Sequence, residues 1–216
     1  MFNFLWFASI SFVAALSGAV VPGPVFIVTI SESLKRGRMS GPLIVLGHLI
    51  LEALIIIAIF LGLDVILRSP QARMAISYIG GATLILMGSY LIRTVKRFRV
   101  NLSLDEAETP LVAHGLIATG MLSSGSNPHF FLWWLTIGMP IMGDCIVTAG
   151  AIGFIAFFLG HSAADMGWFS FVSYSVAKGR RYLNQNAVKY IVFGSAIFLV
   201  IFGLITINNQ IFEMFF

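Results

Sequence analysis

Charged residues are scarce in this chain of 216 residues. Lys, Arg, Asp and Glu together make up only 10% of it, whereas hydrophobic residues make up 58%. Soluble domains contain roughly 25% charged residues, so a soluble globular fold is excluded. The chain has a single cysteine, Cys145, which rules out an intrachain disulfide and a Cys-x-x-Cys redox pair. Because it also has no His-Glu-x-x-His zinc-protease motif, a membrane enzyme is only a remote alternative.

Long apolar stretches fill most of the sequence, and each is long enough to approach or exceed the roughly 20 residues that cross a bilayer as a helix. Six of them are present, at residues 4–31, 39–63, 74–92, 111–142, 145–177 and 190–212. The first is too long for the apolar core of a signal peptide, so a retained span is expected. The sequence therefore predicts an all-α integral membrane protein with six transmembrane helices.

Basic residues gather after the odd-numbered spans, at 35–38, 93–99 and 178–189. Because Lys and Arg are enriched in cytoplasmic loops, these three segments are predicted to be cytoplasmic. The N and C termini then lie outside, and the protein is placed in the cell membrane. The net charge of +4 is explained by this topology, and no nucleic-acid partner is expected.

One linker-like segment, residues 94–110, divides the chain into two halves of three spans each. It is basic at its start and acidic toward its end. We predict a single transmembrane domain, residues 1–216, with a first repeat at about 1–93 and a second at about 111–216. Because each half has an odd number of spans, the two repeats must have opposite orientations in the membrane.

Short sequence matches favour such an inverted repeat. Leu16-Ser17 aligns with Leu122-Ser123, Pro22 with Pro128, and Gly47-His48 with Gly160-His161. Inverted repeats are common in secondary transporters, whose substrate sites lie near the bilayer midplane between the two halves.

Prolines interrupt two of the predicted spans. Pro22-Gly23-Pro24 lies in the first, and Asn127-Pro128 lies in the fourth. Proline removes a backbone donor and clashes with the preceding turn, so the helix is expected to break at both places. A break within the membrane is tolerated where the freed backbone groups face protein or a water-filled cavity. These five residues are therefore predicted to line a substrate site, the alternative being kinks that serve helix packing.

Two histidine-acid pairs occupy matching places in the halves: His48 with Glu52, and His161 with Asp165. Each pair is spaced i,i+4, so both side chains share one face of a helix. Ionisable residues inside a membrane are rare and mark functional pathways, so the four are expected to meet near the midplane. Three roles stay open: they exchange protons, bind a divalent metal as cargo, or stabilise the bundle.

Two further residues are candidates for the same site. His129 follows the Asn-Pro break and is expected to face the cavity, with packing as the alternative. Trp168 follows Asp165 by about one helical turn and is expected to cap the site, or else to anchor the helix at the membrane interface.

The glycines and prolines form a pattern that resembles a known family. Pro22-Gly23-Pro24 is followed by Gly37, Gly41 and Gly47, and the fourth span contains Ser126-Asn127-Pro128-His129-Phe130-Phe131-Leu132-Trp133-Trp134. Both stretches are similar to motifs of the lysine exporter (LysE/RhtB) family, and the Gly-His-x-x-x-acid pairs resemble an archaeal and firmicute subset of it. The resemblance implies a six-helix exporter of small metabolites, often amino acids, driven by proton antiport.

The predicted function is thus secondary active export of amino acids or related small metabolites across the cell membrane. The expected partners are a small-molecule substrate, protons as the coupling ion, and the lipid bilayer. No cofactor is expected, and a homodimer stays open. The alternative is an exporter of a divalent metal or another ion through His48, Glu52, His161 and Asp165.

Overall fold

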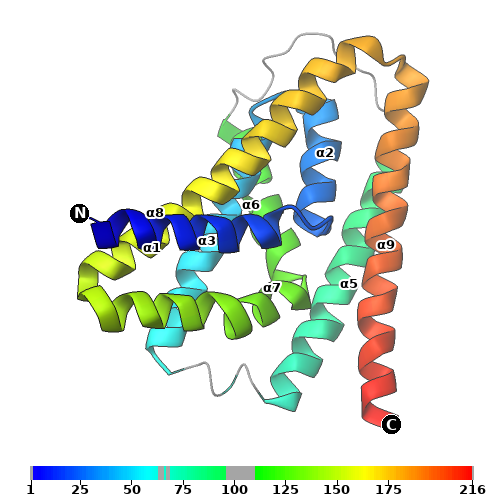
Figure 1. Ribbon diagram of the computed structural model, residues 1–216. Helices are drawn as coiled ribbons and strands as arrows, with labels where there is room; N and C mark the ends of the chain where they lie inside the picture. The colour runs from blue at the N-terminus through cyan, green and yellow to red at the C-terminus, as the bar shows by residue number, and fades with distance from the viewer. Residues whose placement is uncertain (1, 63–65, 67–68, 96–109, 216) are drawn as a thin grey trace.

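The computed structural model describes residues 2–62, 66, 69–95 and 110–215, and all regular elements in those ranges are helices (Figure 1). They are α1 Phe2–Ala19, α2 Pro24–Arg36, α3 Ser40–Phe60, α5 Pro70–Val95, α6 Pro110–Gly125, α7 Pro128–Trp133, the π-helix η2 Trp134–Gly138, α8 Met139–Gly179, the 3-10 helix η3 Arg180–Tyr182 and α9 Gln185–Phe215.

Several of these helices are long and apolar enough to cross a membrane. Within the described ranges there are four such helical segments, Ser40–Phe60, Pro70–Arg93, Pro128–Gly179 and Gln185–Asn208. The pair α1 and α2, bent by 75°, forms a fifth if it is counted as one span. The protein is therefore an all-α, multi-pass membrane protein, as the sequence predicts at that coarser level.

Both predicted helix breaks are present. Helix α1 ends at Ala19 and α2 begins at Pro24, whose missing N–H costs nothing at the first position of a helix. Helix α6 ends at Gly125 and α7 begins at Pro128. There Asn127 caps the new helix, since its side-chain oxygen accepts a hydrogen bond of 3.1 Å from the His129 N–H.

The boundary between the fourth and fifth predicted spans differs from the sequence prediction. The first part of α8, which consists of two helices joined at a kink, runs through residues 143–144, where the prediction ended one span and began the next. The chain bends instead at Gly150, whose φ of 58° is a conformation that other residues rarely adopt. The predicted linker 94–110 falls almost entirely on residues 96–109, which are outside the described part.

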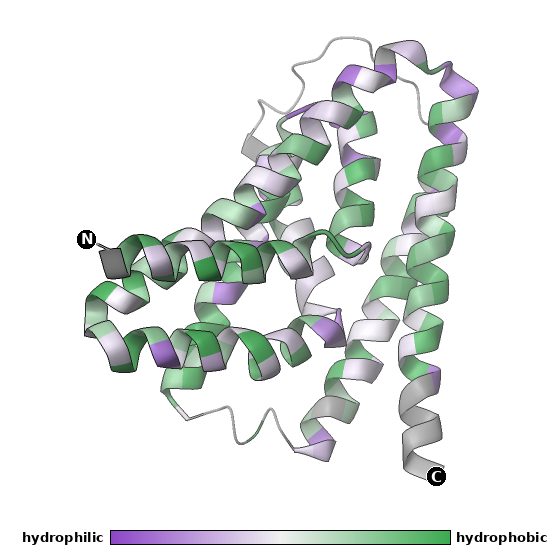
Figure 2. Ribbon diagram, in the orientation of Figure 1, coloured by the Kyte–Doolittle hydropathy of each residue, from purple (hydrophilic) through white to green (hydrophobic). Residues whose placement is uncertain are grey.

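Apolar side chains fill the interior and also cover the outside. One buried cluster joins five helices through Val28, Ile44, Leu84, Leu116 and Leu199. Helix α5 packs along α9, α1 packs on α8, and α3 packs on α6. Large apolar side chains of the long helices are exposed as well, among them Leu86, Leu159 and Ile201, and the hydropathy colouring shows apolar residues along these helices (Figure 2). Such outward apolar faces suit a lipid environment.

Glycine allows α3 and α6 to cross in direct backbone contact. A Cβ added at Gly47 would overlap the carbonyl oxygen of Ile117, and one added at Gly120 would overlap that of Ile44. Small residues at helix interfaces allow such approach in membranes, where close packing drives helix association.

The crossing of α1 and α8 repeats this arrangement. A Cβ added at Gly160 would overlap the carbonyl oxygen of Ala8. The Ser11 hydroxyl donates a hydrogen bond of 2.7 Å to the carbonyl oxygen of Phe157. The two crossings therefore correspond residue by residue. On α8, the counterparts of Gly47 and Ile44 of α3 are Gly160 and Phe157. On α1, the counterparts of Gly120 and Ile117 of α6 are Ser11 and Ala8.

A methyl group at the α3–α6 crossing should separate the two helices. We expect Gly47→Ala to lower the free energy of unfolding by about 1–3 kcal/mol, because the backbone of α6 cannot move away without losing other contacts. Gly115→Ala is the matched control, since nothing lies within 4 Å of its added Cβ. Thermal melting in detergent measures both, and equal melting temperatures would contradict the tight crossing.

Candidate functional site

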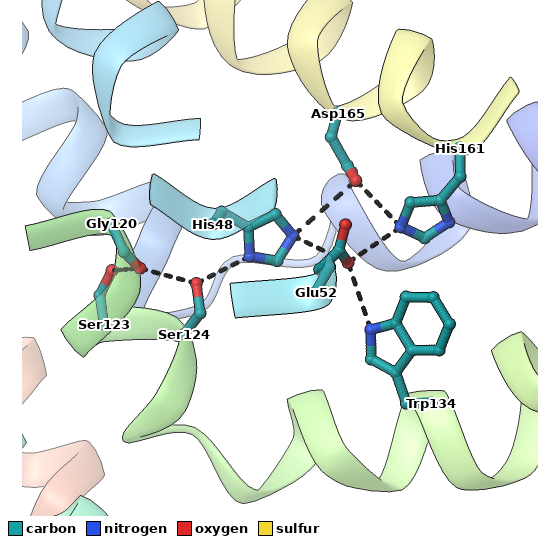
Figure 3. A network of polar contacts seen from close by, with 8 residues as sticks. All are labelled: His48, Glu52, Gly120, Ser123, Ser124, Trp134, His161 and Asp165. Carbon is teal, nitrogen blue, oxygen red and sulfur yellow. Dashed lines mark hydrogen bonds and ion pairs between the residues drawn. The ribbon is translucent and has the colours of Figure 1, made fainter. Parts of the chain in front are cut away.

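Four ionisable side chains meet where α3 and α8 face each other inside the protein (Figure 3). Helix α3 supplies His48 and Glu52, and helix α8 supplies His161 and Asp165. Glu52 is 2% exposed, and His161 and Asp165 are each 3% exposed. The i,i+4 spacing places both members of each pair on the inner face of their helix. The structure thus brings together the two pairs that lie far apart in the sequence.

One oxygen of Glu52 lies at the centre of this cluster. Its Oε1 atom is 2.9 Å from His161 Nε2 and 3.2 Å from His48 Nε2. The indole N–H of Trp134 donates a further hydrogen bond of 3.3 Å to the same oxygen. A buried carboxylate is costly unless it is paired and hydrogen-bonded, and the hydrogen bonds from His161 and Trp134 meet that requirement. Glu52 thereby connects α3 to α8 and to η2.

Asp165 completes the cluster with a looser set of contacts. Its Oδ2 atom lies 3.2 Å from His161 Nε2 and 3.8 Å from His48 Nε2. Within the described part, neither Asp165 Oδ2 nor Glu52 Oε2 has a hydrogen-bond partner. Buried carboxylate oxygens seldom remain unsatisfied. The site therefore has acceptor capacity left for a bound group.

A cavity of about 520 Å³ opens beside these side chains, within the range of small-molecule sites. Both helix breaks and all four ionisable residues line it. Its apolar wall includes five aromatic side chains, namely Phe26, Phe130, Trp133, Phe169 and Phe202. The site thus combines a charged end with an aromatic wall.

A cation could be held at one side of the cluster. His48, Glu52 and Asp165 each offer one ligand atom, and these atoms lie within 4.8 Å of one another. A nitrogen and two carboxylate oxygens suit a divalent transition metal. They suit an ammonium group equally well, because each is a hydrogen-bond acceptor when the imidazole nitrogen is bare.

The family was established by comparison with known proteins. The profile of the LysE type translocators matches residues 16–210. The chain belongs to the LysE type translocator family. No curated protein and no solved structure matches the chain. The match confirms the resemblance seen in the sequence and makes this LysE-family protein a membrane exporter of small metabolites.

Most of the predicted site residues of this LysE-family protein line the cavity. They are Pro22, Gly23, Pro24, His48, Glu52, Asn127, His129, His161 and Asp165. Pro128 is not among the described lining residues, although it begins α7 directly beside them. Trp168 is not among them either. Its ring lies 6.1 Å from the ring of Phe171, on the same helix, so the structure does not place it as a cap on the site.

Two residues of the cluster escaped the sequence analysis as site residues. Trp134 is named from the sequence only as part of the family motif, yet it is 1% exposed and its indole N–H donates a hydrogen bond to Glu52. The hydroxyl oxygen of Ser124 lies 2.7 Å from His48 Nδ1. Its position shortly before the Asn127 break is the only hint in the sequence. A serine in an apolar helix is too common for that hint to be decisive.

The cap at the second break should matter for transport. Asn127→Ala removes the acceptor for the His129 N–H and should shift the cavity wall, so we expect transport to fall while the protein stays folded. Asn127→Ser keeps a capping oxygen and should retain most of the activity. Efflux per folded molecule in proteoliposomes measures both.

The cap at the start of α9 provides a matched control for the Asn127→Ala variant. Asn184 caps that helix through a 2.8 Å hydrogen bond from the Ala187 N–H, and it is exposed and outside the cavity lining. Asn184→Ala should leave transport unchanged. A similar loss of transport in both alanine variants would show that the cap at Asn127 serves stability alone.

Proposed function

We propose that this protein is a secondary active exporter that moves amino acids or related small metabolites across the cell membrane in exchange for protons. The observation that carries the proposal is the buried cluster of His48, Glu52, His161 and Asp165 at a cavity bordered by two helix breaks. Ionisable groups buried at a broken-helix cavity are characteristic of substrate and proton pathways.

The proposed architecture is six spans in two inverted repeats, about 1–93 and 111–216. The matching crossings, α3 with α6 and α8 with α1, support it, because an inverted repeat exchanges these two pairs. The segment Pro128–Gly179 supplies part of the fourth span and all of the fifth, since its 52 residues far exceed one crossing. The bend at Gly150 is where we divide them.

The proposed orientation has the basic ends of α2 and α8 in the cytoplasm and both termini outside. These two ends lie together, because the buried Arg180 guanidinium donates a 2.8 Å hydrogen bond to the carbonyl oxygen of Leu34. Lys35 and Arg36 follow directly and form ion pairs with Glu32. Positive charge concentrated at one end of a helical bundle marks its cytoplasmic side.

The cavity suits a zwitterion with an apolar side chain. The carboxylates of Glu52 and Asp165 complement an ammonium group. The N-terminus of α2 borders the cavity through Pro24, Val25 and Phe26, and the partial positive charge there favours a carboxylate. The aromatic wall then contacts the side chain of the substrate. Glu52 and Asp165 are the residues that we propose exchange protons as the protein alternates between the two sides.

Export of a divalent metal is the second candidate. It is favoured by the close grouping of ligand atoms from His48, Glu52 and Asp165. In that case the metal is cargo, and the imidazole and the carboxylates replace part of its water shell.

Neutral amide variants test the proton role. Glu52→Gln and Asp165→Asn keep the shape of the side chains but cannot carry the titrating proton. We expect efflux driven by a pH gradient to fall by about tenfold or more, while substrate exchange without a gradient partly survives. Glu32→Gln is the control, because Glu32 pairs with Lys35 outside the cavity. Unchanged gradient-driven efflux in both amide variants would overturn proton antiport through these residues.

Histidine variants separate the two cargo candidates. If a divalent metal is the cargo, His48→Ala should abolish its binding, measured by calorimetry, and its exchange. If amino acids are the cargo, the parent protein should exchange radiolabelled amino acids and show no saturable metal binding. Saturable metal binding that His48→Ala removes, together with no amino-acid exchange, would replace the first candidate by the second.

Cysteine labelling tests the orientation. In a Cys145→Ala background, Ser69→Cys and Tyr182→Cys should react with membrane-impermeant maleimide from opposite sides of the membrane. Ser69 lies just before α5, and Tyr182 is 77% exposed beside the basic end of α8. Labelling of both from the same side would contradict the proposed arrangement of spans.

A further inference from the structure

Hydrogen-bond geometry at Ser124 determines which ring nitrogen of His48 carries a hydrogen. The Ser124 Oγ atom lies 2.8 Å from the carbonyl oxygen of Gly120, which can only accept, so the hydroxyl hydrogen points there. The same Oγ lies 2.7 Å from His48 Nδ1 and is left to act as an acceptor (Figure 3). Both short contacts are satisfied together only when His48 Nδ1 carries the hydrogen.

This arrangement leaves the other nitrogen of a neutral His48 ring bare. His48 Nε2 faces Glu52 Oε1 at 3.2 Å and Asp165 Oδ2 at 3.8 Å. Glu52 Oε1 already accepts hydrogen bonds from His161 and Trp134. A lone pair on His48 Nε2 and two carboxylate oxygens then surround one position in the cavity, and all three are acceptors. That position favours a positively charged donor.

His161 has the opposite arrangement. Its Nε2 lies 2.9 Å from Glu52 Oε1 in hydrogen-bonding geometry, and an ionised carboxylate can only accept, so Nε2 carries the hydrogen while Glu52 is ionised. Its Nδ1 is buried and has no hydrogen-bond partner among the described residues. The two histidines therefore hold their ring hydrogens on different nitrogens, although they occupy corresponding places on α3 and α8.

The difference between the histidines originates in the helices that cross α3 and α8. Since Gly120 of α6 corresponds to Ser11 of α1 at the two crossings, the residue one turn later in each helix corresponds too: Ser124 in α6 and Ala15 in α1. This register corrects the sequence match of Leu16-Ser17 with Leu122-Ser123, which would place Gly18 opposite Ser124. Ala15 is 3% exposed and lines the same cavity. Its methyl side chain offers no oxygen, so Ala15 cannot give His161 Nδ1 the kind of partner that Ser124 gives His48 Nδ1.

We propose that Ser124 is a positioning residue that holds the ring hydrogen of His48 on Nδ1, so that Nε2 is presented to a positively charged donor in the cavity. Because Ser124 in one half corresponds to Ala15 in the other, His48 is the imidazole that faces the cargo, and His161 is the imidazole that orients Glu52. The donor is the ammonium group of the cargo or the coupling proton. This role rests on the proposed function, whereas the position of the ring hydrogen does not.

The ring hydrogens can be observed directly. Nitrogen-15 NMR of histidine-labelled protein in detergent distinguishes a hydrogen on Nδ1 from one on Nε2, and His48→Gln assigns the His48 signals among the four histidines. At a pH where the ring is neutral, His48 should show Nδ1–H in the parent protein and in Ser124→Thr, and a mixture of both forms in Ser124→Ala. In Ala15→Ser, His161 should shift toward Nδ1–H.

Transport measurements test whether the orientation of the His48 ring by Ser124 contributes to transport. Ser124→Ala should lose about tenfold in transport, as is typical when the partner that orients a histidine ligand is removed. A raised KM for exchange identifies the cargo ammonium as the donor, whereas a loss confined to gradient-driven efflux identifies the proton. Ser123→Ala is the matched control, since Ser123 also donates to the Gly120 carbonyl oxygen and is equally buried.

Several results would overturn the proposal. They are a neutral His48 with its hydrogen on Nε2 in the parent protein, a His48 ring that holds both hydrogens at every pH tested, and unchanged ring hydrogens in Ser124→Ala. Transport that is equal in Ser124→Ala and Ser123→Ala would remove the functional role. If the parent protein transports no amino acid but the NMR pattern is found, the proposed function fails and the ring arrangement stands.

Discussion

The shared oxygen of Glu52 is the interaction on which the centre of this protein depends. Glu52 Oε1 joins α3 to α8 through His161 and to η2 through Trp134. The carboxylate is almost completely buried, and removing one partner of a buried ionic pair typically costs about 3–5 kcal/mol. The helices around the cavity are thereby joined by a polar contact between ionisable side chains, whereas the other buried polar side chains of the described core are mostly serines and threonines.

Backbone contact between helices makes this central cluster geometrically feasible. Because Gly47 and Gly160 precede the two histidines directly, the tightest points of the α3–α6 and α8–α1 crossings lie next to the polar residues. The side chains that follow each glycine are then held between helices that cannot separate without losing packing. A broken helix on each side leaves the space that becomes the cavity, since neither α1 nor α6 continues straight past the cluster.

The α3–α6 and α8–α1 crossings are alike in backbone arrangement and different in chemistry. The crossings repeat nearly position by position, yet Ser124 stands where the other half has Ala15. An exporter must bind cargo on one side and release it on the other, and its two halves need not perform the same task. A single hydroxyl makes the two corresponding imidazoles unequal, because Ser124 pairs with Nδ1 of His48 whereas Nδ1 of His161 has no hydrogen-bond partner among the described residues.

The sequence by itself determined the membrane setting, the helical class, the two helix breaks and the four ionisable residues. These follow from local rules: an apolar stretch must be helical in lipid, proline cannot continue a helix, and a charge in a bilayer is rare without a function. Only the tertiary structure decided that α8 bends at Gly150 and runs through 143–144, that Trp134 and Ser124 contact the ionisable cluster, and that Trp168 is not among the residues that line the cavity. Those outcomes depend on which helices cross and on how closely their backbones approach, and no single segment of sequence contains that information.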